Sequence, residues 1–470
     1  MSAPVGLIAS ARRILPLAWP VLVGQLAVLA FGTVDTVLVA RFAAVDLAAL
    51  AVGAAAYISV FVGLMGVVLA VSPISGQLFG AGKLEEAGHQ LHQALWLAVG
   101  LSVLGCSLLL MPQPFLDLSH ASPEIARKVR AYLQGLAFAL PPALLFTAFR
   151  GFNTAVSRPK TVMALQLGAL AMKLPLSGLL VFGMALPLPW GEWRIPALGA
   201  PGCGIATAII MWVQGLVAWQ VVRRDPFYLP FGLRGRGWGR PHGASLRELL
   251  RLGVPSGLSV LIEVTGFTFM AFFIARMGTT AVAGHQLVAN LTAILFMVPL
   301  SLGNATATLV AQRVGANDPR DARHLAWQGL KISLALATVM GCSVYFAREG
   351  VLHLYTRDEV IVATALPLLA WLAVFHVADA AQTMASFILR AYRIVTIPLV
   401  IYTVAIWGVG LGGGYALAFN TTGASPLSMQ GARGFWSAAA LGLVVAGAGL
   451  CAFLGWVMRQ QAAAAKAPPP

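Results

Sequence analysis

The chain has 470 residues, of which 59% are hydrophobic and only 10% are charged. Soluble domains carry about 25% charged residues, so this composition excludes a soluble globular protein and indicates a chain that crosses a membrane many times. The net charge of +15 is also typical of nucleic-acid-binding proteins. However, the basic residues cluster in short loops beside apolar runs, where attraction to anionic lipid accounts for them. We therefore expect membrane lipids as partners, and no nucleic acid.

Twelve apolar runs, separated by turn residues or charges, are long enough to cross a bilayer core of about 30 Å. They cover residues 14–40, 48–75, 91–112, 128–150, 160–186, 200–222, 247–275, 283–311, 325–346, 360–389, 394–418 and 432–457. The segment 223–247 is rich in Gly, Pro and Arg, which predicts a cytoplasmic linker. The Ala- and Pro-rich end, 458–470, predicts a disordered tail.

The two halves of the chain repeat each other at a constant offset. At this offset Pro20 matches Pro255, and Arg41 matches Arg276. Such residues are rare in apolar sequence, so their matches are harder to obtain by chance than matches of Ala or Leu. We predict an all-α polytopic membrane protein with twelve transmembrane helices in two six-helix bundles, an N-terminal one over 1–222 and a C-terminal one over 248–457.

An even number of spans places both termini on one side of the membrane. If that side is the cytoplasm, most of the Lys and Arg residues lie in cytoplasmic loops, as is general for membrane proteins. We therefore expect both termini in the cytoplasm. The four cysteines lie in or beside apolar runs, without a CxxC or Cys/His cluster, so neither disulfides nor a cysteine metal site is predicted.

A few ionisable residues lie inside the predicted spans: Asp35, Lys173, Glu263, His376 and Asp379. A charge at the centre of a span costs about 2.5–3.5 kcal/mol on insertion scales, and such residues usually face a cavity or pair with one another. They therefore mark candidate ion or substrate sites.

His376, Asp379 and Gln382 are spaced by three residues and share one face of a helix. We expect this polar face to line an internal cavity. His376 is there either a proton relay or a structural histidine with satisfied hydrogen bonds.

Sequence motifs of soluble enzymes are absent. The chain contains no GxxxxGK[ST] phosphate loop, no GxSxG and no HExxH. We therefore predict that the protein is not an enzyme and needs no cofactor.

Five stretches resemble the multidrug and toxic compound extrusion (MATE) transporters, and most closely their bacterial NorM-like branch. They are VDTVLVARFAAVDLAALAVG, SPISGQLFGAGKLEEAG, FRGFNTAVSRPKTVM, ALGAPGCGIATAIIMW and DAAQTMASFILRAY. The resemblance covers residues 14–457. It implies two six-helix bundles around a central cleft, in the bacterial inner membrane. It also implies secondary antiport, in which a small cationic drug leaves while Na⁺ or H⁺ enters.

The resemblance assigns Asp35, Glu263 and Asp379 to the acids of helices 1, 7 and 10 in this family. It implies that these acids and Lys173 take part in ion coupling and substrate binding, with a candidate Na⁺ site at Glu263 and Asp379. The other residues expected to line the cavity are polar or aromatic side chains within or near the spans: Gln25, Asn153, Ser177, Gln286, Asn290, Phe375, His376 and Gln382.

The chain departs from this family in two places. Lys173 and Ser177 stand where relatives often carry asparagines, and Phe375 stands one turn before Asp379, where an aromatic hydroxyl is expected. Lys173 lies about 20 Å along the helix from Lys160, too deep to reach the surface comfortably. It pairs with Asp35, or with backbone carbonyls or water, or it contacts substrate directly.

Two other functions remain open. A flippase for lipid-linked oligosaccharides belongs to the same superfamily, but its cavity should be basic enough to hold pyrophosphate. A membrane-embedded enzyme would need a nucleophile and base or a metal pattern, neither of which is evident. The sequence leaves open the choice between Na⁺ and H⁺ and the native substrate. We expect a monomer.

Overall fold

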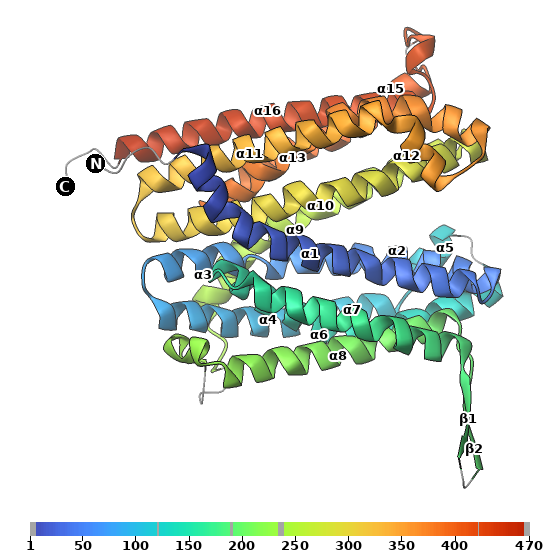
Figure 1. Cartoon of the computed structure of the whole chain (residues 1–470), viewed down its shortest axis with the longest axis horizontal. Helices are drawn as coiled ribbons and strands as arrows, with labels where there is room; N and C mark the ends of the chain where they lie inside the picture. Colours follow the sequence, from blue (N-terminus) through green and yellow to red (C-terminus); the bar gives the residue numbers. More distant parts are fainter. Residues whose placement is uncertain (1–5, 120–121, 189–190, 234–238, 422, 465–470) are drawn as a thin grey trace. The chain divides into compact units, whose positions relative to one another are not determined.

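The computed structural model describes residues 6–119, 122–188, 191–233, 239–421 and 423–464 (Figure 1). The first half contains helices α1 (Leu7–Ala40), α2 (Ala44–Val68), α3 (Val71–Gly80), α4 (Leu84–Leu110), α5 (Gln113–Ser119), α6 (Pro123–Ala155), α7 (Pro159–Phe182) and α8 (Ala200–Arg224). The second half contains α9 (Gly243–Ala275), α10 (Thr279–Gly315), α11 (Pro319–Phe346), α12 (Arg348–Tyr355), α13 (Glu359–Ala391), α14 (Thr396–Thr403), α15 (Gly413–Ala418) and α16 (Ala432–Ala464). Short 3-10 helices cover Pro226–Phe231 (η1) and Leu427–Met429 (η3), and a π-helix covers Val404–Gly412 (η2).

The predicted twelve spans are confirmed within the described residues. Twelve helical segments, some made of more than one helix, are long and apolar enough to cross a membrane. The second span consists of α2 and α3 together, and the eleventh consists of α14, η2 and α15. The chain is therefore a polytopic helical membrane protein.

The chain packs as two compact units. The N-terminal unit comprises residues 23–257, and the C-terminal unit comprises residues up to 22 together with those from 258 onward. The two boundaries, after Leu22 and after Gly257, are separated by the same offset that relates Pro20 to Pro255. Helices α1 and α9, the first helix of each repeat, are thus divided between the units at equivalent positions. The packing divides the chain differently from the predicted boundaries at 222 and 248.

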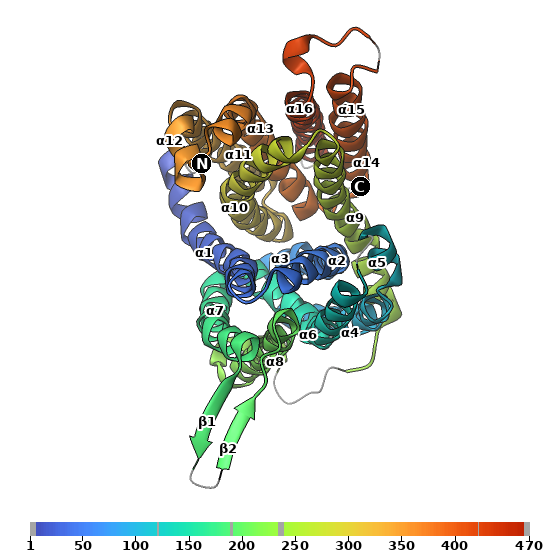
Figure 2. The same cartoon turned by 90° about the vertical axis from the view of Figure 1, so that its right-hand side faces the viewer.

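Each unit is built around the fourth span of its repeat. In the N-terminal unit α6 packs against α2, α4 and α8 (Figure 2). In the C-terminal unit α13 packs against α10, α11 and α16. Both central helices have 33 residues. The core of the C-terminal unit is formed by leucine, alanine and aromatic side chains gathered around α13.

A pair of glycines attaches the first half of α9 to the N-terminal unit. A Cβ atom at Gly253 would overlap the backbone of Val67, and one at Gly257 would overlap the backbone of Gly63. The two glycines are four residues apart, so they lie on one face of α9 and let it approach α2 closely. This contact explains why residues 243–257 pack with the N-terminal unit.

Three regions differ from the sequence-based expectations. A β-hairpin, β1 (Met184–Leu188) with β2 (Gly191–Ile195), follows α7 and extends beyond the ends of α7 and α8 (Figure 1), so the fifth span ends at Phe182 rather than at 186. Residues 458–464, expected to be disordered, continue α16, because Ala, Gln and Arg favour helix. The remainder of the tail, 465–470, lies outside the described residues.

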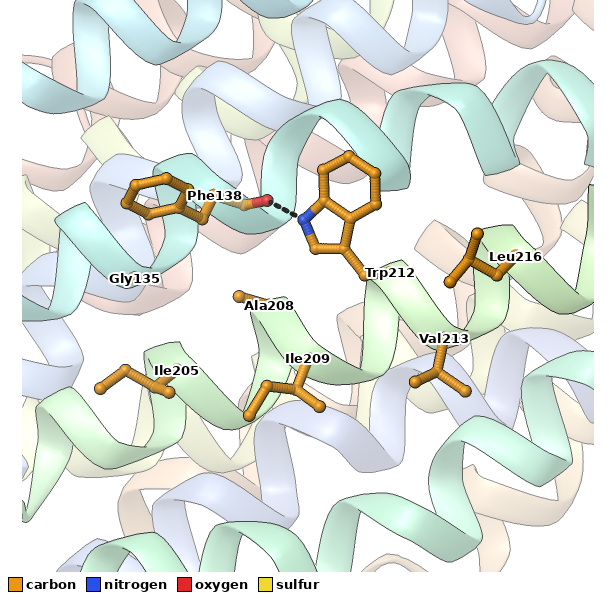
Figure 3. A pocket seen from close by; sticks show the side chains of 8 residues that line it. All are labelled: Gly135, Phe138, Ile205, Ala208, Ile209, Trp212, Val213 and Leu216. Carbon is orange, nitrogen blue, oxygen red and sulfur yellow. Dashed lines mark hydrogen bonds between the residues drawn. The ribbon is translucent and has the colours of Figure 1, made fainter.

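The Pro141-Pro142 pair in α6 leaves two carbonyls without a helical donor. Pro142 has no N–H for the carbonyl of Phe138, and Pro141 has none for the carbonyl of Ala137. Neighbouring helices supply both missing donors. The Trp212 indole N–H of α8 donates to Phe138 O at 3.1 Å (Figure 3), and the Cys106 thiol of α4 donates to Ala137 O at 3.2 Å. The α6 backbone is therefore satisfied from two sides.

We expect Trp212→Phe to lower the stability of the protein by about 0.6–1.7 kcal/mol, the range of hydrogen bonds between helices in membranes. The measurement is the midpoint of thermal unfolding of purified protein in detergent. Trp219→Phe on the same helix is the matched control, because Trp219 is exposed and its ring is covered by Arg223 at 3.9 Å. Equal shifts for the two variants would contradict a role for the indole N–H.

Candidate functional site

The N-terminal unit contains a buried ion pair. Asp35 comes from the last third of α1, and Lys173 comes from α7. The Lys173 Nζ atom lies 2.9 Å from Asp35 Oδ1, and the lysine side chain is fully buried. Ser177, one turn after Lys173, donates from its hydroxyl to the same carboxylate oxygen at 3.2 Å. Of the alternatives left open for Lys173, the structure shows the pairing with Asp35.

The Lys173 ammonium has further acceptors on α8. Its Nζ atom lies 2.6 Å from Thr207 Oγ1 and 3.4 Å from the carbonyl oxygen of Cys203. The Thr207 hydroxyl in turn donates to the Cys203 carbonyl at 2.8 Å. An ammonium has three N–H donors, and here it has three acceptors. The site therefore holds a fully coordinated cation that belongs to the chain itself.

A second buried acid in the N-terminal unit was not identified from the sequence. Asp46 in α2 is 1% exposed; its Oδ2 accepts from Lys128 at 2.6 Å and its Oδ1 from the backbone N–H of Ala200 at 2.9 Å. Ala200 is the first residue of α8, where backbone donors are free and an anion is favoured. Asp46 therefore joins α2, α6 and α8. The predicted span began at 48, which placed this acid in a loop.

The predicted linker is partly built into the N-terminal unit. Tyr228 in η1 is fully buried, and its hydroxyl donates to Asn153 Oδ1 at 2.6 Å. Burial raises the pKa of Tyr228 to about 12, so its hydroxyl stays protonated at neutral pH. Gln93 of α4, also fully buried, bonds the carbonyl of Arg240 at 3.1 Å and the N–H of His242 at 2.7 Å. Asn153, predicted to line a cavity, thus binds the linker.

A single guanidinium lies near Gln25, another predicted cavity residue. Arg150 of α6 donates to Gln25 Oε1 at 3.5 Å and to the Met65 sulfur at 3.2 Å. Both are weak contacts for a guanidinium. Gln25 is ten residues from Asp35, about 15 Å along α1, so the two residues belong to different parts of the unit.

The C-terminal unit contains a small polar cavity of about 20 Å³, enough for one water-sized group. Its polar lining residues come from three helices: Ser259 and Glu263 of α9, Gln382, Ser386 and Arg390 of α13, and Tyr402 of α14. The Tyr402 hydroxyl is a hydrogen-bonding partner of both Glu263 and Gln382. Tyr402 was not identified from the sequence, and it brings an aromatic hydroxyl to the acid of α9.

Asp379 lies one turn before Gln382 on α13. Its side chain is buried, is an electrostatic neighbour of Glu263 and has the Thr383 hydroxyl as a hydrogen-bonding partner. His376 is 1% exposed, and its Nε2 atom has no hydrogen-bond partner among the described residues. Phe375 packs between Phe267 and Trp436, with ring centroids 5.8 and 5.6 Å away. The predicted polar face of α13 is therefore buried in this unit.

Two predicted cavity residues lie apart from this cluster. Gln286 and Asn290 are exposed and one turn apart on α10. Asn290 Oδ1 accepts from the Tyr355 hydroxyl at 3.2 Å. Neither residue lines the cavity around Glu263.

A larger cavity is entirely apolar in its side chains. It is a groove of about 430 Å³ between α6 and α8, beside the exposed rings of Phe138 and Trp212 (Figure 3). No ionisable side chain lines it. A cationic substrate would find no counter-charge there, so the groove does not belong to the candidate site.

Because a lone buried charge costs more than a pair, removing one partner of Asp35–Lys173 should destabilise the protein by about 3–5 kcal/mol. We expect Lys173→Met and Asp35→Asn each to lower the thermal midpoint strongly. The double variant should regain much of the loss. The measurement is a double-mutant cycle on purified protein in detergent. Additive losses would show that the two side chains are not energetically coupled.

The matched control for this cycle is the exposed ion pair of Lys83 and Glu86, whose atoms lie 3.0 Å apart with both side chains more than half exposed. Exposed pairs contribute little, so Lys83→Met and Glu86→Gln should leave the midpoint almost unchanged.

Comparisons with known proteins agree with this architecture. The model of the MatE family matches twice, over residues 20–179 and 255–416. The two matches begin at Pro20 and Pro255, the pair that marks the repeat, which confirms the internal duplication. The chain is 37% identical to the "Probable multidrug resistance protein NorM" of Aromatoleum aromaticum over 98% of this chain and 96% of that protein. It is 33% identical to the "Multidrug resistance protein PmpM" of Pseudomonas aeruginosa over 94% and 91% of the two chains.

Solved structures show the same fold. The Vibrio cholerae MATE transporter VcmN in the bent form superposes with a TM-score of 0.82, at 18% identity over 97% of this chain and 98% of that one. The eukaryotic MATE transporter AtDTX14 superposes with a TM-score of 0.83, at 18% identity over 98% and 99%. Together with the family match over more than half of its length and the relatives at 37% and 33% identity, these findings show that the chain belongs to the MatE family of membrane transporters.

Proposed function

We propose that this chain exports cationic and amphipathic drugs in exchange for Na⁺ or H⁺. Its relatives carry the names of multidrug resistance proteins. The observation that carries the proposal is the placement of Glu263 and Asp379, two carboxylates inside spans of one unit. Among the described residues no Lys or Arg forms an ion pair with either of them. An ionised carboxylate away from water is costly, so binding a proton, a metal ion or an organic cation there is favoured over leaving the charge uncompensated.

The cavity at Glu263 suits a small coupling ion. Besides the Arg390 guanidinium, its lining offers a carboxylate, a phenol, an amide and two hydroxyls, and hard cations prefer oxygen ligands of this kind. A proton on the carboxylate would satisfy the same charge. Asp379 then serves as the second acid, and a cationic drug that approaches either carboxylate competes with the coupling ion. Competition for one charge is the basis of exchange.

The N-terminal unit has a different part in this proposal. The Lys173 ammonium already occupies the place where a mobile cation would bind Asp35. We infer that Asp35 takes no coupling ion and that coupling depends on Glu263 and Asp379. The Asp35–Lys173 pair then serves to hold α1, α7 and α8 together, and Ser177 belongs to the same framework. Gln25 lies apart from the pair, beside Arg150 of α6.

The alternatives fit less well. A flippase for lipid-linked oligosaccharides needs cations for pyrophosphate, whereas the buried lysine is neutralised by Asp35. In the C-terminal cluster the single arginine at the cavity, Arg390, is outnumbered by the two acids Glu263 and Asp379. An embedded enzyme finds no support in the names of the relatives, which describe resistance proteins and transporters. We therefore retain the antiporter, acting as a monomer in the bacterial inner membrane.

Transport tests this function directly. Everted membrane vesicles with the wild-type chain should accumulate a cationic dye such as ethidium when a pH or Na⁺ gradient is imposed. The gradient that drives uptake identifies the coupling ion. Absence of uptake under both gradients would refute the antiporter.

We expect Glu263→Gln and Asp379→Asn to express normally and to lose most of the dye transport, because each removes a charge and keeps the shape. Glu349→Gln is the matched control, since Glu349 is exposed on α12 of the same unit. Its transport should equal that of the wild type. Wild-type transport by either of the two buried variants would exclude that residue from the coupling site.

The orientation of the termini is a separate prediction. We expect both ends in the cytoplasm, because most basic residues then lie in cytoplasmic loops. Alkaline phosphatase fused after residue 470 should be inactive in cells, whereas a fusion at the β1–β2 hairpin should be active, since the hairpin follows the fifth span. The reverse pattern would invert the topology.

A further inference from the structure

Arg390 is a charge in a span that the proposed function does not yet use. It is the last residue but one of α13 and lines the same cavity as Glu263. Among the described residues it forms no ion pair, and its guanidinium lies over the Phe387 ring at 4.8 Å. A guanidinium stays charged at any physiological pH. A permanent cation thus faces the coupling carboxylate across a space that holds about one water-sized group.

The polar residues of α13 form one stripe that leads to this arginine. Gln382, Ser386 and Arg390 follow each other at intervals of four residues, and Asp379 precedes Gln382 by three. Such spacing places them on one face of the helix. Glu263 faces the same cavity from α9. Arg390 is therefore the cation at one end of a polar stripe that passes both acids of the C-terminal unit.

The arrangement of Glu263 leaves its charge available. The carboxylate has a neutral hydrogen-bonding partner, the Tyr402 hydroxyl, and Arg390 is its electrostatic neighbour without forming an ion pair among the described residues. In the other unit Lys173 touches Asp35 at 2.9 Å and is fixed by two further acceptors. Arg390 lies over the Phe387 ring and near Glu263, and no ion pair or hydrogen bond fixes its guanidinium among the described residues. One acid thus has an internal cation in direct contact, and the other has a nearby cation without an ion pair.

We propose that Arg390 is a displaceable internal counter-ion of Glu263, which a coupling ion or a cationic drug must displace to bind. This inference rests on the proposed antiport at the same site. When Glu263 is empty, the guanidinium moves into the cavity and compensates the carboxylate. When an external cation binds there, the guanidinium returns to Phe387. Arg390 thereby sets how strongly the site holds its ligands and prevents the carboxylate from remaining bare between them.

The test uses the binding of ethidium to the purified full-length chain, measured by fluorescence anisotropy. Arg390→Gln removes the competitor, so the dye Kd should fall by about 5- to 20-fold, within the usual range of coupling between sites. Arg390→Lys keeps a cation and should stay within about threefold of the wild type. If Arg390→Gln is not monodisperse, Arg390→Met supplies a neutral side chain of similar length.

The decisive measurement repeats the substitution in the Glu263→Gln background. Because Arg390 acts through Glu263, Arg390→Gln should then leave the dye Kd unchanged. A purely structural role or a long-range charge effect would act equally in both backgrounds. Lys331→Gln is the matched control, because it removes an exposed cation of the same unit and should not change the Kd.

Three outcomes separate the inference from the function on which it rests. An unchanged Kd in Arg390→Gln, with transport by the wild type, overturns the counter-ion and leaves the antiporter intact. A tightening that persists in Glu263→Gln also overturns it, because the arginine then acts elsewhere. Failure of the wild type both to bind and to transport the dye overturns the proposed function itself.

Discussion

The free energy of an unpaired charge away from water is the constraint on which this structure depends. Lys173 is fully buried in a span, and it is tolerated because Asp35, Thr207 and the Cys203 carbonyl accept its three N–H donors. These partners come from α1 and α8, so the lysine can be buried only when three helices are in contact. The packing of α1, α7 and α8 in the N-terminal unit therefore depends on the contact between Lys173 and Asp35. Without either partner, the remaining charge would oppose the packing that buries it.

The C-terminal unit meets the same constraint with neutral groups. Glu263 is bonded by the Tyr402 hydroxyl, which compensates part of its lost hydration without cancelling its charge. The two halves of the chain share an architecture, as the equal lengths of α6 and α13 show. Their acids are not equivalent in the repeat, because Glu263 aligns with Val28 rather than with Asp35. The two halves therefore share the framework, while the acid of one half is paired with a lysine and the acid of the other has no ion pair among the described residues.

The sequence predicted the twelve spans, the repeat and the family, because long apolar runs and matched Pro and Arg residues are local signals. For Lys173 the sequence left three alternatives open, of which the structure shows the pair with Asp35, and only the resemblance placed the two helices side by side. Asp46 was missed because a boundary error of a few residues moved it into a loop. The linker appeared soluble from its Gly, Pro and Arg content, and the burial of Tyr228 depends on Asn153, 75 residues away. Tyr402 could not be assigned to Glu263 either, because a contact between residues so far apart in the chain produces no repeating pattern in the sequence.

The contrast between a fixed and a displaceable counter-ion limits what the antiporter can exchange. A binding site works in a cycle only if its ligand can leave, and Lys173 cannot leave Asp35 because it is tethered and fully coordinated. On the proposed mechanism only Glu263 and Asp379 change partners during transport. Each carboxylate balances one elementary charge, so the chain can exchange at most two elementary charges in a cycle. On the proposed mechanism Lys173 therefore affects the stoichiometry of exchange as well as the stability of the protein, since a chain with an unpaired Asp35 would have a third exchangeable charge.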